Sequence, residues 1–413
     1  MNATHPRSVA VATGLLTLMC SSAILLPSCA SYETNSKKND RLALESFHGN
    51  KAQLAIQQAQ QAYRVSDLNT ARGNAEAAIA LVDDNADFHV LYGRILCEQH
   101  ALEKGMEAFK RAIEIDPKNS SAHYYQGVVF QRWSNDTRAA AAYKAAFDLV
   151  PSDLYYFCAY VETLLGMRDF ETAHQVIEES LVYFEHNASA HRLRGHLALL
   201  ESKPADAADH FYQAMLVAPD DAALVDDLII ALYDSGQFVR CRHYIDQLLE
   251  KEDTSDRVDL LHLKARCLIE TDMLVEARMV YLQALKMNPD SQPMWYEMGM
   301  LCQRLGDWRR VEDAARQHVT KWPNRYEGYL LRGLLNEYKE KDEAAAADFA
   351  RATSLTDNPT DPAILLGLTY RRLGRFQEAD AAFQIALEAE GQDPELETLL
   401  AGFDDSGDTV GRW

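Results

Sequence analysis

The sequence predicts an all-α protein, an α-α superhelix built from about ten helix-turn-helix repeats. Residues 86–119 contain two runs in which apolar side chains recur every three or four residues, which is the spacing of two amphipathic helices. The small residues Gly93, Gly105 and Ala112 stand where paired helices must approach closely. Pro117 ends the second run. The unit recurs at a 34-residue step, and such a period is typical of a solenoid.

The repeat resembles the tetratricopeptide repeat (TPR), whose pattern has a small residue at position 8, Ala at 20, an aromatic at 24, Ala at 27 and Pro at 32. Counted from Ala86, these positions hold Gly93, Gly105, Phe109, Ala112 and Pro117. Six copies fill residues 52–255 and four fill residues 258–393. Chance does not explain alanine at position 20 in seven of ten copies, which are Ala71, Ala139, Ala173, Ala207, Ala277, Ala345 and Ala379. The resemblance implies a TPR solenoid in which each repeat buries its faces against its neighbours.

Two extra residues, Asp256 and Arg257, separate the two sets of repeats. They are interpreted either as a surface insertion or as a break in superhelical pitch that divides the array into two arms. Repeats four and six carry Val161 and Ile229 at position 8, where the pattern has a small residue. We expect these larger side chains to push the paired helices apart.

Residues 1–28 have the features of an export signal, because an apolar run at residues 9–26 precedes small residues at a cleavage point. The run Leu26-Pro27-Ser28-Cys29 resembles a bacterial lipobox, which implies that Cys29 is acylated and becomes the new N-terminus. Ala30, where some lipoproteins have Asp, favours the outer membrane by the same resemblance. An uncleaved membrane anchor and an ordinary secretory signal are the alternatives.

The array is flanked by segments without its period. Residues 29–51 are polar and aperiodic, and they predict a flexible tether between lipid and solenoid. Asp393 followed by Pro394 is typical of a helix start, so residues 394–403 are predicted to form a helix that caps the last repeat. Residues 404–413 are predicted to be disordered.

Composition and motifs predict a protein that is not an enzyme. The formal charge of −21 and the pI near 5.0 argue against nucleic acid as a partner, because phosphate contacts need a basic surface. The sequence has no phosphate-binding loop, no nucleophile elbow and no zinc-binding helix. We therefore expect no cofactor and no metal site. Whether Cys241 and Cys267, in adjacent repeats, form a disulfide is left open.

The TPR resemblance implies that the first helix of each repeat lines a concave groove, through positions 2, 5, 9, 12 and 13. Tyr and Arg are the residue types that anchor protein interfaces. The predicted partner-binding residues at these positions are Arg94, Tyr124, Arg132, Tyr155, Arg192, His196, Arg266, Tyr296 and Arg304. The Lys and Asn with which some TPR domains clamp a C-terminal carboxylate are absent from repeat three, which has Tyr124 and Val128 instead.

These features together predict a lipid-anchored scaffold in the cell envelope that binds a protein or peptide partner in its groove and faces the periplasm, with the outer membrane favoured. The resemblance to bacterial TPR lipoproteins implies a role in assembling an envelope complex. One alternative keeps the solenoid in the cytoplasm on an uncleaved anchor. A further alternative is an enzyme whose site is built across several repeats. The partner, the pathway and the oligomeric state do not follow from the sequence.

Overall fold

The computed structural model describes residues 28–251, 256–390 and 394, with side chains from residue 37 onward. Of the predicted segments, the export signal before Ser28, the cap beyond Pro394 and the tail lie outside the described residues. All regular elements of the described chain are helices, and they form two compact units with the boundary between Met167 and Arg168.

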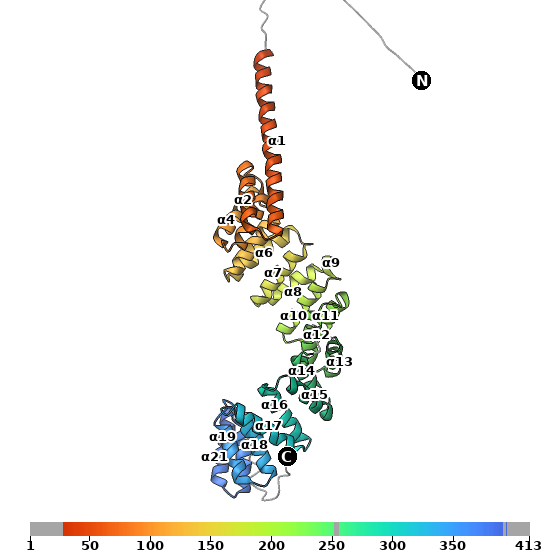
Figure 1. The fold of residues 1–413 in the computed structure, drawn as a ribbon, viewed down its shortest axis with the longest axis vertical. Coiled ribbons are helices and arrows are strands. Elements are labelled where there is room, and N and C mark those ends of the chain that lie inside the picture. The colour runs from red at the N-terminus through yellow and green to blue at the C-terminus, as the bar shows by residue number, and fades with distance from the viewer. Residues whose placement is uncertain (1–27, 252–255, 391–393, 395–413) are drawn as a thin grey trace, which may run out of the picture. The chain divides into compact units, whose positions relative to one another are not determined.

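The first unit contains seven helices, which Figure 1 draws from red to yellow-green. They are α1 (Ser28–Arg64), α2 (Leu68–Leu81), α3 (Ala86–Glu98), α4 (Leu102–Ile115), α5 (Ser120–Arg132), α6 (Asp136–Leu149) and α7 (Leu154–Gly166). Each helix from α1 to α6 packs against the next one in the chain.

The second unit begins with α8 (Phe170–Glu179), the single turn α9 (Leu181–Phe184), α10 (Ala188–Leu200), α11 (Pro204–Val217), α12 (Ala222–Asp234), α13 (Phe238–Leu249) and α14 (Val258–Glu270). It continues with α15 (Leu274–Met287), α16 (Gln292–Arg304), α17 (Trp308–Lys321), α18 (Tyr326–Tyr338), α19 (Asp342–Thr353), α20 (Thr360–Arg372) and α21 (Phe376–Glu390). Here too, sequential helices pack in helix-turn-helix pairs.

The helices follow the 34-residue count. From α2 onward, each second helix starts at position 17 of a repeat and each first helix starts at position 1, as Ala86 and Leu102 illustrate in repeat two. Helix α1 starts earlier, and α9 is an additional turn within repeat four. The predicted all-α array of TPR-type helix pairs is confirmed.

Polar caps and turns set the helix ends. Asn or Asp side chains accept hydrogen bonds from the first backbone amides of many helices, as Asn85 does for α3 and Asp153 for α7. Position 15, in the turn between the two helices of each repeat, has a positive φ of 53–74° in all ten repeats. The residues at this position are Ser66, His100, Ser134, Arg168, Ser202, Gly236, Asp272, Gly306, Glu340 and Gly374.

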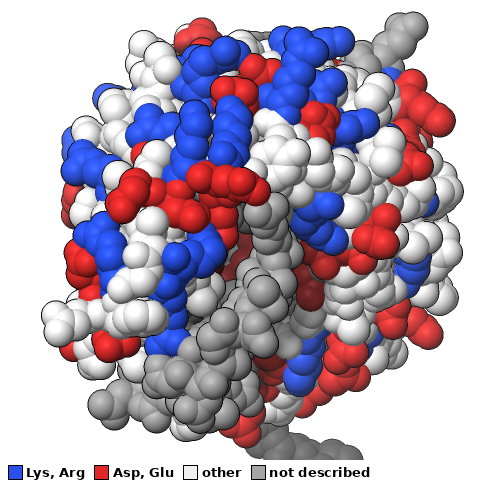
Figure 2. All heavy atoms as spheres, turned by 90° about the horizontal axis from the view of Figure 1, so that it is seen from below, with Lys and Arg blue, Asp and Glu red and all other residues white. Residues whose placement is uncertain are grey.

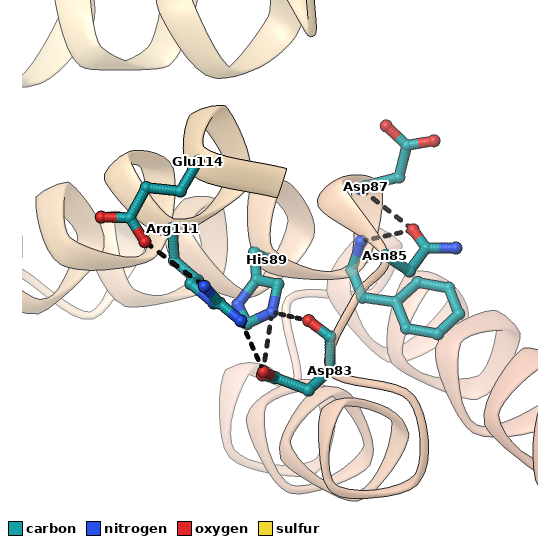
Figure 3. Close-up of polar contacts among 7 residues, drawn as sticks. Asp83, Asn85, Asp87, His89, Arg111 and Glu114 are labelled. Atoms are coloured by element: carbon teal, nitrogen blue, oxygen red, sulfur yellow. Dashed lines mark hydrogen bonds and ion pairs between the residues drawn. The ribbon is translucent and has the colours of Figure 1, made fainter. Parts of the chain in front are cut away.

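A recurrent hydrogen bond joins successive repeats. The carbonyl oxygen at position 32 accepts a bond of 2.9–3.1 Å from the ring at position 4 of the next repeat. The donors are His89, His123, His191, Trp295 and Tyr329. Figure 3 shows the first case, in which His89 contacts Asp83, while Arg111 of α4 pairs with the Asp83 carboxylate at 2.8 Å. The hydrogen bond from Arg111 holds the pKa of Asp83 below its usual range.

The core of five repeats (two, three, five, nine and ten) contains a glycine at position 8 that faces an aromatic ring at position 24. A Cβ on Gly93 would lie 2.5 Å from the ring of Phe109, and a Cβ on Gly195 would lie 2.5 Å from the ring of Phe211. Both rings are completely buried. The small residue is therefore required because the ring fills the space between the two helices.

Repeat six has a larger side chain at position 8 and a smaller one at position 24. It has Ile229 at position 8 and Ile245 at position 24, and both side chains are buried in one hydrophobic cluster. The smaller partner at position 24 makes room for the larger one at position 8. The backbones of α12 and α13 are less closely packed against one another than those of α10 and α11.

The segment predicted to be a flexible tether, residues 29–51, is helical in the structure and belongs to the continuous helix α1. The buried side chains of α1 start at Ala52, and residues 37–47 are exposed. The segment has no proline after Pro27, so it extends a helix already nucleated in repeat one at little further cost.

The inserted Arg257 is ordered by ion pairs. Its Nη1 lies 2.8 Å from Asp226 of α12 and its Nη2 lies 2.5 Å from Asp259 of α14. These carboxylates raise the pKa of Arg257, with the Asp259 hydrogen bond as the main cause. The insertion thus ties repeat six to repeat seven. The boundary between the two compact units lies in repeat four and not at this insertion.

Candidate functional site

The first helices of repeats one to three line a pocket of about 780 Å³ within the first unit. Its walls come from α1, α3, α5, the turn before α2 and the first residue of α2. The lining residues are Gln60, Tyr63, Arg64, Ser66, Leu68, Asp87, Val90, Leu91, Arg94, Glu98 and Ser121. We call this cavity the Arg94 pocket. Its volume is in the range of sites that hold a small ligand or a few residues of a peptide.

Arg94 lies between two tyrosines. Its guanidinium carbon is 5.1 Å from the ring centroid of Tyr63 and 4.9 Å from that of Tyr125. This double cation–π contact holds the side chain without neutralising its charge. The Nε of Arg94 is buried without a hydrogen-bond partner, and the guanidinium forms no ion pair with any described side chain.

The other charged groups of the pocket differ in their partners. Asp87 accepts a hydrogen bond of 2.9 Å from Asn119, and Glu98 lies 3.7 Å from Arg132. Arg64 is exposed and, within the described chain, forms neither a hydrogen bond nor an ion pair through its side chain. The carboxylates of the pocket are therefore partnered, whereas its two guanidinium groups are not.

Basic groups at the position of Arg94 in two other repeats do have acidic neighbours. His196 lies 3.6 Å from Asp227, which is 31 residues later in the sequence. Arg266 stacks on Tyr233 at 4.9 Å, as Arg94 does on Tyr63, and Glu297 follows it by 31 residues. The residue 31 positions after Arg94 is Tyr125. A phenol thus takes the place that a carboxylate has in the other two cases.

Glu297 is an ionised group held by several donors. Burial favours its neutral form, but hydrogen bonds of 2.6 Å from both His262 and Tyr281 outweigh burial and hold the pKa of Glu297 below its usual range. The positive charge of Arg266 contributes in the same direction. Arg266 therefore has an internal counter-charge.

Most other predicted groove residues are also satisfied within their unit. Arg192 pairs with Asp227 at 2.7 Å, and Arg304 lies 3.7 Å from Asp272. Arg132 donates a 3.0 Å hydrogen bond to the carbonyl oxygen of Cys97 besides its contact with Glu98. These arginines stabilise contacts between adjacent repeats.

Of the predicted tyrosines, two are half-buried and one is exposed. Tyr124 packs 5.1–5.5 Å from the rings of Tyr125, Tyr143 and Tyr156, and burial raises its pKa. Tyr296 packs near His318 and Tyr326, and burial raises its pKa as well. Tyr155 is 75% exposed.

The predicted sector of Arg132, Tyr155, Arg192 and His196 is divided between the two units. Arg192 and His196 meet on Asp227 in the second unit, and Arg132 and Tyr155 belong to the first. The sequence did not point to Tyr63, Arg64 and Tyr125. Two signals would have distinguished Arg94 from the other groove residues: the aromatic Tyr63 at position 12 of the preceding repeat, and Tyr125 in place of an acidic residue 31 positions later.

The structure offers few other candidate sites. On the face in Figure 2, Lys and Arg side chains alternate with Asp and Glu, so no patch of one charge covers it. Among the described residues, no group of three His, Cys, Asp or Glu side chains is placed to hold a metal ion. In the same part of the chain, no helix is both long and apolar enough to cross a membrane. The thiols of Cys241 and Cys267 are free and completely buried.

Comparison with known proteins supports the repeat assignment. Models described as tetratricopeptide repeat match residues 56–120, 161–223 and 364–397. The type IV pilus assembly protein PilF of Pseudomonas aeruginosa is 23% identical over 185 residues, which are 44% of this chain and 73% of that protein.

Three solved structures align with parts of this chain. A TPR protein from Parabacteroides merdae has a TM-score of 0.42 at 15% identity, with coverage of 78% of this chain and 99% of that one. P. aeruginosa PilF has a TM-score of 0.40 at 21% identity, covering 51% and 94%. PilW, described as a widely conserved type IV pilus biogenesis factor, has a TM-score of 0.43 at 16% identity, covering 49% and 96%. The fold and the sequence matches make this chain an all-helical TPR array with distant similarity to pilus assembly proteins.

Proposed function

We propose that this TPR protein is a lipid-anchored scaffold of the cell envelope that binds a segment of a partner protein in the groove lined by its first helices. The Arg94 pocket is the observation that carries the proposal, because the first helices of three successive repeats converge there around charged groups without partners. TPR folds are scaffolds for protein–protein interaction, and this groove is the place where such a partner fits.

The envelope location rests on the N-terminal sequence. Residues 9–26 are apolar and Cys29 follows a lipobox-like run, so acylation at Cys29 would place the array at a membrane surface, facing the periplasm, with the outer membrane favoured. The distant similarity to PilF supports a role in assembling a surface structure such as a type IV pilus. In this proposal, the protein positions its partners and does not catalyse a reaction.

The anchor is tested by the intact mass of the protein from its native membrane fraction, with and without Cys29→Ser. A mass that starts at Cys29 and includes acyl chains, lost in the variant, is the expected result. A mass that includes Met1 would refute the lipoprotein and move the search for partners to the cytoplasm.

The groove is tested by photo-crosslinking in cells from a benzoylphenylalanine at Gln60, which lines the pocket, or at Tyr155. The control site is Lys110, an exposed residue of the second helix α4 that does not line the pocket. We expect a partner band from Gln60 that is absent from Lys110. Equal crosslinking from both sites would contradict binding in the groove.

A further inference from the structure

We propose that the Arg94 pocket binds an acidic side chain of an extended segment in another protein, with the guanidinium of Arg94 as its anchor. This inference rests on the proposed function, because it assigns a ligand chemistry to the same groove. It is specific to the first unit, where α1, α3 and α5 build the pocket.

The first argument is the state of Arg94 itself. A guanidinium remains charged at any physiological pH, and a half-buried one is stabilised by a carboxylate that takes two parallel hydrogen bonds. Tyr63 and Tyr125 hold Arg94 by its faces, at 5.1 and 4.9 Å, and leave the hydrogen-bonding edge of the group without a partner. The side chain is thus held in place before the ligand arrives, which reduces the entropy lost on binding.

The second argument is the balance of charge within the pocket. Its two carboxylates, Asp87 and Glu98, have partners in Asn119 and Arg132. The guanidinium of Arg64 adds a second positive group without an ion pair to any described residue. The lining thus carries as many guanidinium as carboxylate groups, and one of its carboxylates, Glu98, already lies 3.7 Å from a third guanidinium, that of Arg132. On a chain whose formal net charge is −21, this makes the pocket a locally less acidic place in which a single carboxylate can be accommodated.

The third argument is the comparison between repeats. His196 and Arg266 stand at the same repeat position as Arg94, and acidic residues 31 positions later, Asp227 and Glu297, face them. Tyr125 stands at that place for Arg94 and supplies an aromatic face instead. The carboxylate that the other repeats provide internally is the group that a partner would provide here.

A peptide fits these observations better than a phosphate-rich ligand. The pocket lies along successive first helices and has Tyr63, Val90 and Leu91 in its lining, which suits an extended chain whose side chains insert one at a time. A polyphosphate or nucleic acid carries a charge on every phosphate, so the acidic surface of the whole molecule would repel it more strongly than a segment with a single carboxylate at the pocket. We therefore assign the pocket to Asp or Glu within a protein segment.

The experiment uses a random dodecapeptide library displayed on phage, with blocked C-termini, selected against the full-length protein in detergent. The same selection is made on Arg94→Gln, on Tyr125→Glu and on Arg138→Gln. The last variant is a matched control, because Arg138 makes a cation–π contact with Phe130 at 5.8 Å but lies on α6, outside the pocket. Circular dichroism melting verifies that each variant is folded.

We expect Asp and Glu to be enriched on the wild type and on Arg138→Gln. The enrichment should disappear on Arg94→Gln, which removes the charge, and on Tyr125→Glu, which supplies the internal carboxylate. A synthetic peptide of the selected sequence should bind Arg94→Gln about tenfold more weakly or worse, and its Glu→Gln analogue should bind the wild type with a similar loss.

Peptides without acidic enrichment would overturn the carboxylate assignment and leave the scaffold function in place. Acidic peptides that bind Arg94→Gln as well as the wild type would move the site away from this pocket and overturn the inference. Selection of no peptide by any variant would contradict both the inference and the proposed groove. Enrichment of sequences from this chain's own acidic tail, residues 404–413, would overturn the assignment to another protein and indicate a second copy as the occupant.

Discussion

The exchange of volumes between positions 8 and 24 can be tested by a double-mutant cycle in repeat five. Gly195→Ile should destabilise that repeat by ~1–3 kcal/mol, because even a Cβ on Gly195 lies 2.5–2.7 Å from three ring atoms of Phe211. Phe211→Ile should cost about 1–2 kcal/mol through the space it leaves in a buried site. The double variant recreates the pair of Ile229 and Ile245 in repeat six, which is fully buried.

The double variant should therefore lose less stability than the two single variants lose together. The difference, which is the coupling free energy, should be ~1–3 kcal/mol. Hydrogen–deuterium exchange of α10 and α11 is the assay, since a repeat array need not unfold in one step and local opening free energies are needed. Gly73→Ala is the matched control, because its Cβ meets no atom within 4 Å and should stabilise α2 by about 0.5–1 kcal/mol. Additive losses in the double variant would refute the exchange of volumes.

Three further predictions concern buried polar groups of the second unit. Burial lowers the pKa of His318, so the folded state requires a neutral imidazole. The free energy of unfolding should therefore fall as the pH drops below about 6.5, the pKa of histidine in the unfolded chain. His318→Leu should remove this loss of stability between pH 7 and 5, as measured by urea titrations. Asp348 is buried and accepts hydrogen bonds of 2.5–3.0 Å from Arg332. Asp348→Ala should therefore lower the free energy of unfolding by ~1–3 kcal/mol, measured by thermal melting. An unchanged melting temperature would contradict the role of this pair. The thiols of Cys241 and Cys267 are completely buried and should react with maleimide only after unfolding; rapid labelling of the native protein would show that the packing is looser than described.

The positions of the helices could be predicted because the same few residues recur in at least half of the repeats. A small residue at position 8, an aromatic at 24 and a proline near 32 recur with a fixed period, and the helices begin where this count places them. The N-terminal half of α1 was the exception. Residues 37–51 have no buried side chain and therefore no apolar period to detect, although they belong to the helix that continues into repeat one.

The electrostatics of the groove were harder to predict. Arg192 and Arg94 look alike in the sequence, yet Arg192 is neutralised by Asp227 and Arg94 is not neutralised by any described residue. This difference depends on which side chain the following repeat presents, some 31–35 residues away. Counting groove residues one repeat at a time therefore cannot separate a free arginine from a paired one.

The turns at position 15 have a practical consequence for engineering. Seven of the ten have a residue other than glycine in left-handed backbone, where a side chain costs roughly 1 kcal/mol. Changing Ser134, Ser202 or Glu340 to glycine would strengthen single repeats in small, separate increments without altering the core. A panel of such variants would stabilise one repeat at a time by a small and similar amount. Comparing them along the chain would measure how far the opening of one repeat spreads to its neighbours.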